Sequence, residues 1–339
     1  MNDKLVLEAL ERRVERRNDR REFFKNAGVF AAGAAGMAAL SACGGGSSGS
    51  TTPAVGQTST ISDADVLNFA LNLEYLEANF YSVAFTGQPI SASLQSGTGT
   101  QGAVNTAGTQ MVPFSDPVVK AYAQEITKDE VNHVTFLRGA LGNAAVAQPA
   151  IDISVSGTSA FTMAAQAAGL ISSGQTFSPY LSDNHFLLGA FIFEDVGVTA
   201  YKGASPLIAN KTYLEAAAGI LAVEAYHAGL VRAAIFARGI DMPTAAPTPA
   251  GTLPNSMIIG AANAISDARD SLDGSSDDDQ GVGSLASPTL VPTDGNSIAF
   301  SRTTTQVLDI VYLTKAAATK GGFFPNGVNG TINASAVQS

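Results

Sequence analysis

The chain has 339 residues, of which 45% are hydrophobic and 14% charged, and this composition excludes an intrinsically disordered protein. The formal net charge is −10, and no basic stripe follows the first 42 residues, so nucleic acid is not an expected partner. The single cysteine, Cys43, excludes disulfides within the chain and metal sites built from thiolates.

The N-terminal region has the organisation of an export signal. Arg20 and Arg21 precede an apolar run at residues 27–42, which is rich in alanine and glycine and too short to span a bilayer comfortably. Cys43 follows the run directly. This order resembles a twin-arginine signal that ends in a lipobox.

We therefore expect residues 1–42 to be a twin-arginine lipoprotein signal and Cys43 to be acylated after cleavage. Residues 43–60 are rich in Gly, Ser and Thr and are expected to form a flexible tether. The protein would then be exported by the twin-arginine route and anchored by its lipid to a membrane facing the periplasm or cell envelope.

Four segments beyond residue 60 place apolar residues at steps of three and four, which is typical of one face of a helix. The first and third segments each carry a glutamate on that face with a tyrosine seven residues later. These pairs are Glu74 with Tyr81 and Glu194 with Tyr201. The predicted helices begin near residues 61 and 115 and cover residues 184–201 and 212–238.

The second and fourth segments each carry a glutamate with a histidine three residues later. These pairs are Glu130 with His133 and Glu224 with His227, and they use two of the three histidines in the chain. The first two segments therefore look like a divergent repeat of the last two.

A glutamate and a histidine three residues apart project from the same side of a helix and can bind one ion. Two such pairs, with one glutamate from each of the other helices, supply six donors inside a bundle. Carboxylates buried there without cations would be very costly. The donor set suits two metal ions, with iron expected and manganese the alternative.

Glu77 is an alternative to Glu74 as the donor of the first helix, because it lies one turn later. The repeat favours Glu74, since Glu194 aligns with it whereas Gly197 aligns with Glu77. His185 has no partner glutamate at the right spacing, so we expect a capping or surface role for it.

Three further acidic features are expected to lie outside the site. Asp129 and Asp195 neighbour predicted donors in sequence but should point elsewhere on their helices. The acidic run at residues 270–279 fits no calcium-binding loop and is expected to be solvated.

The residues at 72–81, Asn-Leu-Glu-Tyr-Leu-Glu-Ala-Asn-Phe-Tyr, resemble the ferritin-like family that includes plant desiccation-related proteins. The segment Gly-Gly-Phe-Phe-Pro at 321–325 is similar to the C-terminal region of that family. The resemblance implies an all-α fold, a ferritin-like four-helix bundle with a long crossover between helices 2 and 3. We expect the bundle at residues 61–245 and a C-terminal extension packing on it at residues 246–339.

Within these regions the pattern predicts shorter helices as well. One lies in the crossover, near residues 160–171, and two lie in the extension, at residues 256–272 and 304–318.

Carried over by position, the resemblance implies that Glu130 and Glu224 bridge the two metals and that each histidine binds one of them. Tyr81 and Tyr201 would donate hydrogen bonds to carboxylates across the bundle. The implied ligands are Glu74, Glu130, His133, Glu194, Glu224 and His227.

The expected function is di-iron redox chemistry on O₂ or peroxide in stress protection. One alternative is a non-catalytic protein that protects the envelope during desiccation, and another is manganese catalase-like peroxide dismutation. The expected partners are a membrane, through the lipid anchor, and O₂ or peroxide as a small substrate. Whether the site is catalytic, and how the chain oligomerises, stay open at this point.

Overall fold

The computed structural model describes residues 61–240 and 252–338. The predicted twin-arginine pair Arg20 and Arg21, the predicted acylation site Cys43 and the predicted tether lie outside the described residues, as does the predicted boundary between bundle and extension. The described part is mostly helical, which confirms the predicted all-α class.

The first two bundle helices have clear sequence boundaries. Helix α2 (Asp63–Thr86) begins after Ser62, whose hydroxyl caps the first turn, and ends at Gly87, whose φ of 76° is in the left-handed region that glycine tolerates. Helix α3 (Pro117–Leu141) begins after Asp116, whose carboxylate accepts backbone N–H groups of its first turn.

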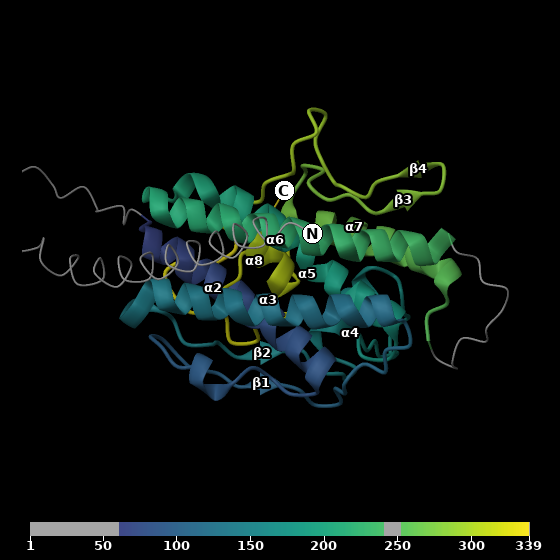
Figure 1. Ribbon diagram of the computed structural model, residues 1–339, viewed down its shortest axis with the longest axis horizontal. Helices are drawn as coiled ribbons and strands as arrows, with labels where there is room; N and C mark the ends of the chain where they lie inside the picture. The colour runs from purple at the N-terminus through teal and green to yellow at the C-terminus, as the bar shows by residue number, and fades with distance from the viewer. Residues whose placement is uncertain (1–60, 241–251, 339) are drawn as a thin grey trace, which may run out of the picture.

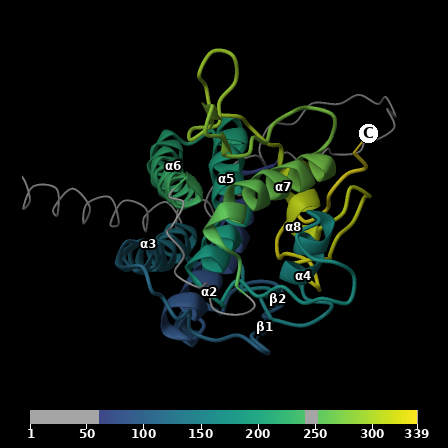
Figure 2. The ribbon, with the colours of Figure 1, turned by 90° about the vertical axis from the view of Figure 1, so that its right-hand side faces the viewer.

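The second helix pair repeats this arrangement. Helix α5 (Asp183–Ala204) is capped by Ser182, and after a short 3₁₀ turn (Ser205–Leu207) helix α6 (Lys211–Ile240) runs back along it. Figure 2 shows α3 and α6 as one layer, and α2 and α5 as the next. Helices α2 and α5 are buried along most of their length because other elements cover both of their faces.

Long connections join the helices at the bottom of the bundle in Figure 1. Residues 87–116, between α2 and α3, contain a 3₁₀ turn and the short strand β1 (Val104–Asn105). Residues 142–182 form the long crossover from α3 to α5, with a 3₁₀ turn, strand β2 (Ile151–Asp152) and helix α4 (Ala160–Ala167). Strands β1 and β2 pair in parallel and tie the two connections together.

The C-terminal segment, residues 252–338, covers the face of α2 and α5 that α3 and α6 leave free (Figure 2). It contains helices α7 (Asn255–Asp273) and α8 (Thr304–Tyr312). Helix α8 ends earlier than the predicted residue 318, because Leu313 adopts a left-handed conformation with φ of 55°. The remaining strands are β3 (Gly283–Ser284) and β4 (Ser287–Pro288), which form an antiparallel pair.

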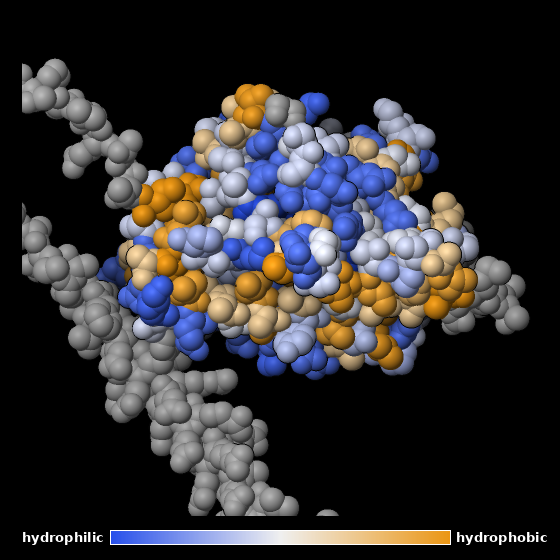
Figure 3. All heavy atoms as spheres, turned by 90° about the horizontal axis from the view of Figure 1, so that it is seen from above, coloured by the Kyte–Doolittle hydropathy of each residue, from blue (hydrophilic) through white to orange (hydrophobic). Residues whose placement is uncertain are grey.

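The surface mixes hydrophilic and hydrophobic residues, and seen from above the hydrophobic ones gather in a band along one edge (Figure 3). Among the described helices, α6 is long and apolar enough to cross a membrane by length and composition alone. It packs along α5 and buries Glu224 and His227 inside the bundle, but only 39% of its most apolar stretch is buried.

Candidate metal centre

The four bundle helices bring six acidic and imidazole side chains together between the two layers. Helices α2 and α5 each supply one glutamate, and α3 and α6 each supply a glutamate and a histidine one turn apart. Steps of three and four residues turn these positions toward the same interior line. The residues, with their exposed fractions, are Glu74 (0%), Glu130 (1%), His133 (8%), Glu194 (2%), Glu224 (0%) and His227 (2%).

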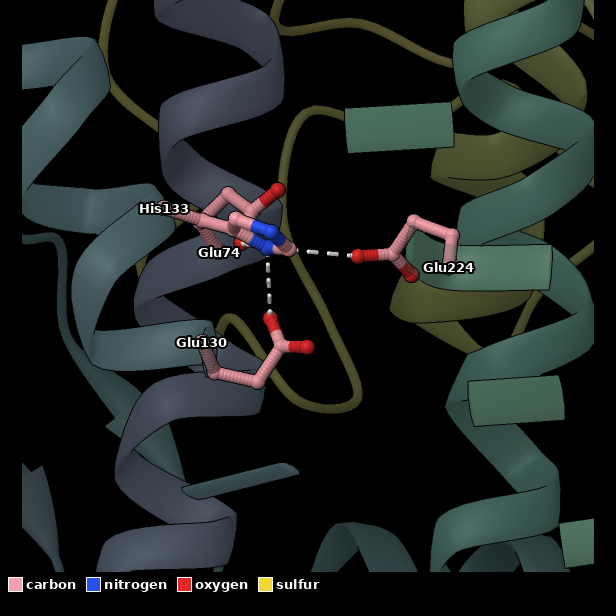
Figure 4. A group of neighbouring side chains, drawn as sticks. All are labelled: Glu74, Glu130, His133 and Glu224. Carbon is pink, nitrogen blue, oxygen red and sulfur yellow. Dashed lines mark ion pairs between the residues drawn. The ribbon is translucent and has the colours of Figure 1, made fainter. Parts of the chain in front are cut away.

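One group of donors surrounds His133. Its Nδ1 lies 3.2 Å from Glu74 Oε2, 3.5 Å from Glu130 Oε2 and 3.5 Å from Glu224 Oε1. Figure 4 shows the imidazole ring between carboxylates that come from α2 and α3 on one side and from α6 on the other. One ligand atom from each of these four residues lies within 4.8 Å of the others, so the group could hold a metal ion.

A second group surrounds His227. Its Nδ1 lies 3.0 Å from Glu130 Oε1 and 3.6 Å from Glu194 Oε2, and these three residues form another set of donors that could hold an ion. The two imidazole ring centres are 6.4 Å apart. Glu130 belongs to both groups, whereas Glu224, the other expected bridge, belongs only to the group of His133.

The donor atoms of the centre do not form hydrogen bonds with one another. Within the described part of the chain, nine buried side-chain nitrogen and oxygen atoms of these six residues have no hydrogen-bond partner, including both oxygens of Glu130 and of Glu224. Burying several carboxylates without compensation is costly. A pair of cations between the two groups would supply that compensation, so the residues fit a two-metal site.

The electrostatics of the carboxyl groups point the same way. Burial raises the pKa of Glu130 and of Glu194 well above the usual range, and the nearby Glu224 carboxylate raises both further. Burial also raises the pKa of Glu224 itself to about 7. In the absence of metal these groups resist ionising together, and cations would relieve that repulsion.

The two histidines differ in their surroundings. Burial disfavours the charged form of His133, yet the nearby carboxylates of Glu74, Glu130 and Glu224 raise its pKa above the usual value. Burial lowers the pKa of His227 to about 4, and repulsion from His133 acts in the same direction. For Glu74, burial opposes ionisation, but His133 lowers the pKa of this carboxyl overall.

Two tyrosines reach the centre across the bundle. The Tyr81 hydroxyl, on α2, donates a hydrogen bond to Glu194 Oε1 on α5, and the Tyr201 hydroxyl, on α5, donates to Glu74 Oε1 on α2. Both phenols are buried. Each hydroxyl therefore binds one oxygen of a carboxylate whose other oxygen faces a histidine.

Glu77, the alternative to Glu74, is buried beside the centre but outside both donor groups. Burial and the neighbouring Glu224 raise the pKa of Glu77 well above its ordinary value. Its counterpart in the repeat is Gly197, where an added Cβ would lie 2.3 Å from Glu224 Oε2 and 3.5 Å from Glu77 Oε1. The glycine thus leaves space for both carboxylates.

Asp129 is the residue that the sequence reasoning missed. It was expected to point away, but its Oδ2 lies 3.5 Å from His227 Nε2. The reason is that its partner is on another helix, α6, rather than on its own. The available clue was its position directly before the glutamate of a Glu-x-x-His pair.

His185 lies at the start of α5, where the backbone N–H of this residue donates to the capping hydroxyl of Ser182. Its ring Nδ1 lies 2.9 Å from the same hydroxyl and is buried, so of the two expected roles the surface one is wrong, whereas the residue does contact the capping Ser182. Burial lowers the pKa of His185 to about 4.

Asp195, as expected, points away from the centre. Its Oδ2 lies 2.7 Å from Arg232 and 2.9 Å from Arg269, in a buried group of charges that we call the Asp195 network. The expectation that residues 270–279 are solvated is wrong for Asp273 and Asp279, which are buried because basic side chains pair with them. The network consists of Asp195, Arg232, Arg269, Asp273, Asp279 and Arg302.

Comparison with known proteins agrees with this architecture. A family model described as a ferritin-like domain matches residues 62–237, more than half of the chain. The desiccation-related protein PCC13-62 of Craterostigma plantagineum is 26% identical over 283 residues, which cover 79% of this chain and 83% of that protein. The ferritin-like catalase Nec2 of Nesocodon mauritianus is 25% identical over 279 residues, 80% of this chain and 84% of that protein. No solved structure matches the chain.

Proposed function

Because this chain belongs to the ferritin-like domain family, we propose that its Glu/His centre binds two transition-metal ions and carries out redox chemistry on hydrogen peroxide. The observation that supports this most directly is the set of buried donor atoms left without hydrogen-bond partners among the described residues. Iron is the expected metal and manganese the alternative, because mixed carboxylate and imidazole donors suit both.

Two such ions, when bound, would accept two electrons from one peroxide molecule and donate two to another, whose O–O bond is cleaved. The reaction that fits is disproportionation, in which one peroxide molecule is oxidised to O₂ while a second is reduced to water, with no further reductant. The similarity to a protein named a ferritin-like catalase supports peroxide as the substrate. The protein's own contribution is to hold the ions between two helix layers and to orient Glu74 and Glu194 through the two tyrosines.

A second function is favoured by the similarity to a desiccation-related protein. In that case the chain protects the cell envelope without catalysis, and the metal is structural or absent. Export by the twin-arginine route and anchoring through an acylated Cys43 are proposals in either case. They rest on the sequence order alone, and the mass of the mature N-terminal peptide would test them.

Metal analysis together with peroxide turnover separates the two functions. We expect the purified protein, supplied with Fe²⁺ or Mn²⁺, to retain two ions per chain and to release O₂ from peroxide. Glu130→Gln should lose both properties, because Glu130 belongs to both donor groups. Glu125→Gln is the matched control, since Glu125 is an exposed acid on the same helix and in neither donor group. A metal-free protein whose thermal unfolding is unchanged by Glu130→Gln would favour the non-catalytic function.

A further inference from the structure

A pocket lies between the bundle and the C-terminal segment. One wall is formed by α5 and α6, and the other by residues 278–302 of the C-terminal segment. This stretch of chain lies on the side of α5 and α6 that faces away from α2 and α3 (Figure 2). The residues that line the pocket include none of the six candidate metal ligands, so it is separate from the metal centre.

Most of the pocket is apolar. Val198 of α5 and Ala228 of α6 line it together with Leu290 and Phe300 of the C-terminal segment, and these side chains offer no hydrogen-bonding groups. Its volume is about 80 Å³, and Val291, also in the lining, is 73% exposed, so the pocket opens to solvent there. An engineered cavity of about 150 Å³ binds benzene. This pocket can therefore enclose part of a molecule of that size and leave the rest at its mouth.

The polar groups of the pocket belong to the Asp195 network. Asp195 and Arg232 line the pocket, and both are buried. Asp195 Oδ2 pairs with Arg232 and Arg269, whereas Asp195 Oδ1 and Arg232 Nε have no hydrogen-bond partner in the described part of the chain. Two side chains that contact each other thus retain one unpaired acceptor and one unpaired donor, which is costly in a buried position.

A hydroxyl is the group that suits both atoms, because it donates one hydrogen bond and can accept others. A charged group fits less well, since the Asp195 network contains as many arginines as aspartates and its charges already balance. An added charge would be buried without a partner of its own. Asp278 also lines the pocket, where it accepts a hydrogen bond from Ser276, and its negative charge further disfavours an anion.

We propose that this pocket binds a neutral, largely apolar molecule with one hydroxyl, of the class of phenols and small alcohols. The hydroxyl lies against Asp195 and Arg232, and the apolar body fills the space between α6 and the C-terminal segment. Because the bound molecule contacts both parts of the chain, it holds the C-terminal segment against the bundle. Its binding does not depend on the metal centre or on the proposed function.

Fluorine NMR of para-fluorophenol, titrated with the full chain, tests this proposal. We expect a Kd of about 1 mM or tighter. Fluorobenzene keeps the ring but lacks the hydroxyl, and it should bind at least about 10-fold more weakly because its hydrogen bonds to charged groups are lost. The anion para-fluorobenzoate and the cation para-fluorobenzylammonium should also bind at least about 10-fold more weakly, because their charges are not compensated. Equal or tighter binding of any of these three analogues, or no binding of para-fluorophenol, would overturn the proposal.

Ala299→Leu locates the bound molecule, because Ala299 lines the pocket, is half-buried, and would fill part of the space as leucine. We expect it to weaken the binding of para-fluorophenol by about 10-fold or more. Ala286→Leu is the matched control, since Ala286 is an exposed alanine of the same segment outside the lining, and it should leave the affinity unchanged. Undiminished binding by Ala299→Leu would place the molecule elsewhere and contradict the proposal.

Hydrogen exchange of the wild-type chain gives a measurement that needs no variant. Backbone amides of residues 290–300 should exchange more slowly when para-fluorophenol is bound, because the molecule holds this stretch against α6. Amides of α3, which does not line the pocket, are the internal reference and should be unchanged. Unchanged exchange at residues 290–300 in the saturated protein would contradict the proposal.

Discussion

The tyrosine hydroxyls are the smallest groups on which the metal centre depends. Tyr201 donates to Glu74 Oε1, while Glu74 Oε2 faces His133. Tyr81 has the same relation to Glu194 and His227. When one oxygen of a buried carboxylate loses its hydrogen-bond donor, either the carboxylate rotates or that oxygen stays unpaired. Both outcomes change the position or charge of the other oxygen, which faces the histidine.

Tyr201→Phe should therefore weaken metal binding by about 10-fold or more, and should destabilise the metal-free protein by about 1 to 3 kcal/mol. Metal titration and urea unfolding measure the two effects. Tyr180→Phe is the matched control, because Tyr180 is also buried but its hydroxyl donates to the Ile153 carbonyl, outside both donor groups. It should lower stability and leave metal affinity unchanged. Equal loss of affinity in both variants would show that Tyr201 acts only through general stability.

His185 makes a pH-dependent contribution that does not involve the centre. Burial holds its pKa at about 4 in the folded chain, against 6.5 in a model compound. As the pH falls from 6.5 toward about 4, the unfolded chain takes up a proton at this ring that the folded chain does not, so folding stability is lost.

His185→Gln should remove this dependence. Between about pH 8 and about pH 5, the wild-type chain should lose about 2 kcal/mol of unfolding free energy relative to the variant. Urea unfolding of both proteins at the two pH values measures the difference. A gap between the two proteins that stays constant with pH would mean that His185 titrates normally in the folded state.

At the scale of the helix, α5 depends on a glycine next to the centre. Gly197 stands where an added Cβ would come 2.3 Å from Glu224 Oε2, closer than non-bonded atoms approach. Alanine would normally favour a helix over glycine, by about 1 kcal/mol. At this position the steric conflict should dominate, because Glu224 is held inside a packed bundle.

Gly197→Ala should thus reduce metal binding although it changes no ligand, and mass spectrometry should find fewer than two ions per chain. Gly219→Ala is the control, because Gly219 lies in helix α6 with open space where its Cβ would be. It should stabilise the protein by up to about 1 kcal/mol and leave the metal content unchanged. Full metal occupancy in Gly197→Ala would show that Glu224 can move aside without loss.

The bundle helices could be predicted because their apolar stripes and caps are local properties of the sequence. Glu74 and Glu130 could be identified as candidate donors for the same reason, since each has an equivalent in the other half of the chain. Asp129 could not be placed, because its partner His227 is on a different helix and no spacing connects them.

The same limit applies to helix ends and to buried charges. Helix α8 was predicted too long because its pattern of apolar residues continues past Leu313, where only the backbone conformation shows the end. Asp279 was expected to be solvated because its partners Arg269 and Arg302 approach it only in the folded chain. Tertiary contacts of this kind produce no regular spacing of residues, so a single sequence does not reveal them.

At the scale of the whole molecule, the Asp195 network fastens the C-terminal segment to the bundle. Asp195 on α5 and Arg232 on α6 pair with each other, and Arg269 on α7 joins Asp195 to Asp279. Arg302, just before α8, then binds both Asp273 and Asp279. Asp195 is the neighbour of Glu194 in the sequence, so the C-terminal segment is attached next to a metal-ligand candidate.

Removing one member of such a network leaves its partners buried and unpaired, which costs more than an exposed ion pair contributes. Arg302→Met should lower the free energy of unfolding by about 3 to 5 kcal/mol, because both Asp273 and Asp279 lose a partner. Lys202→Met is the control, since the Lys202 ammonium donates to the exposed Ser301 hydroxyl at 2.7 Å, and it should change stability by less than about 0.5 kcal/mol. Urea unfolding gives both values. In the Arg302→Met protein, backbone amides of α8 should exchange their hydrogens faster than those of α2, because α2 packs inside the bundle. Equal exchange in the two helices would mean that the C-terminal segment and the bundle unfold as one unit without this network.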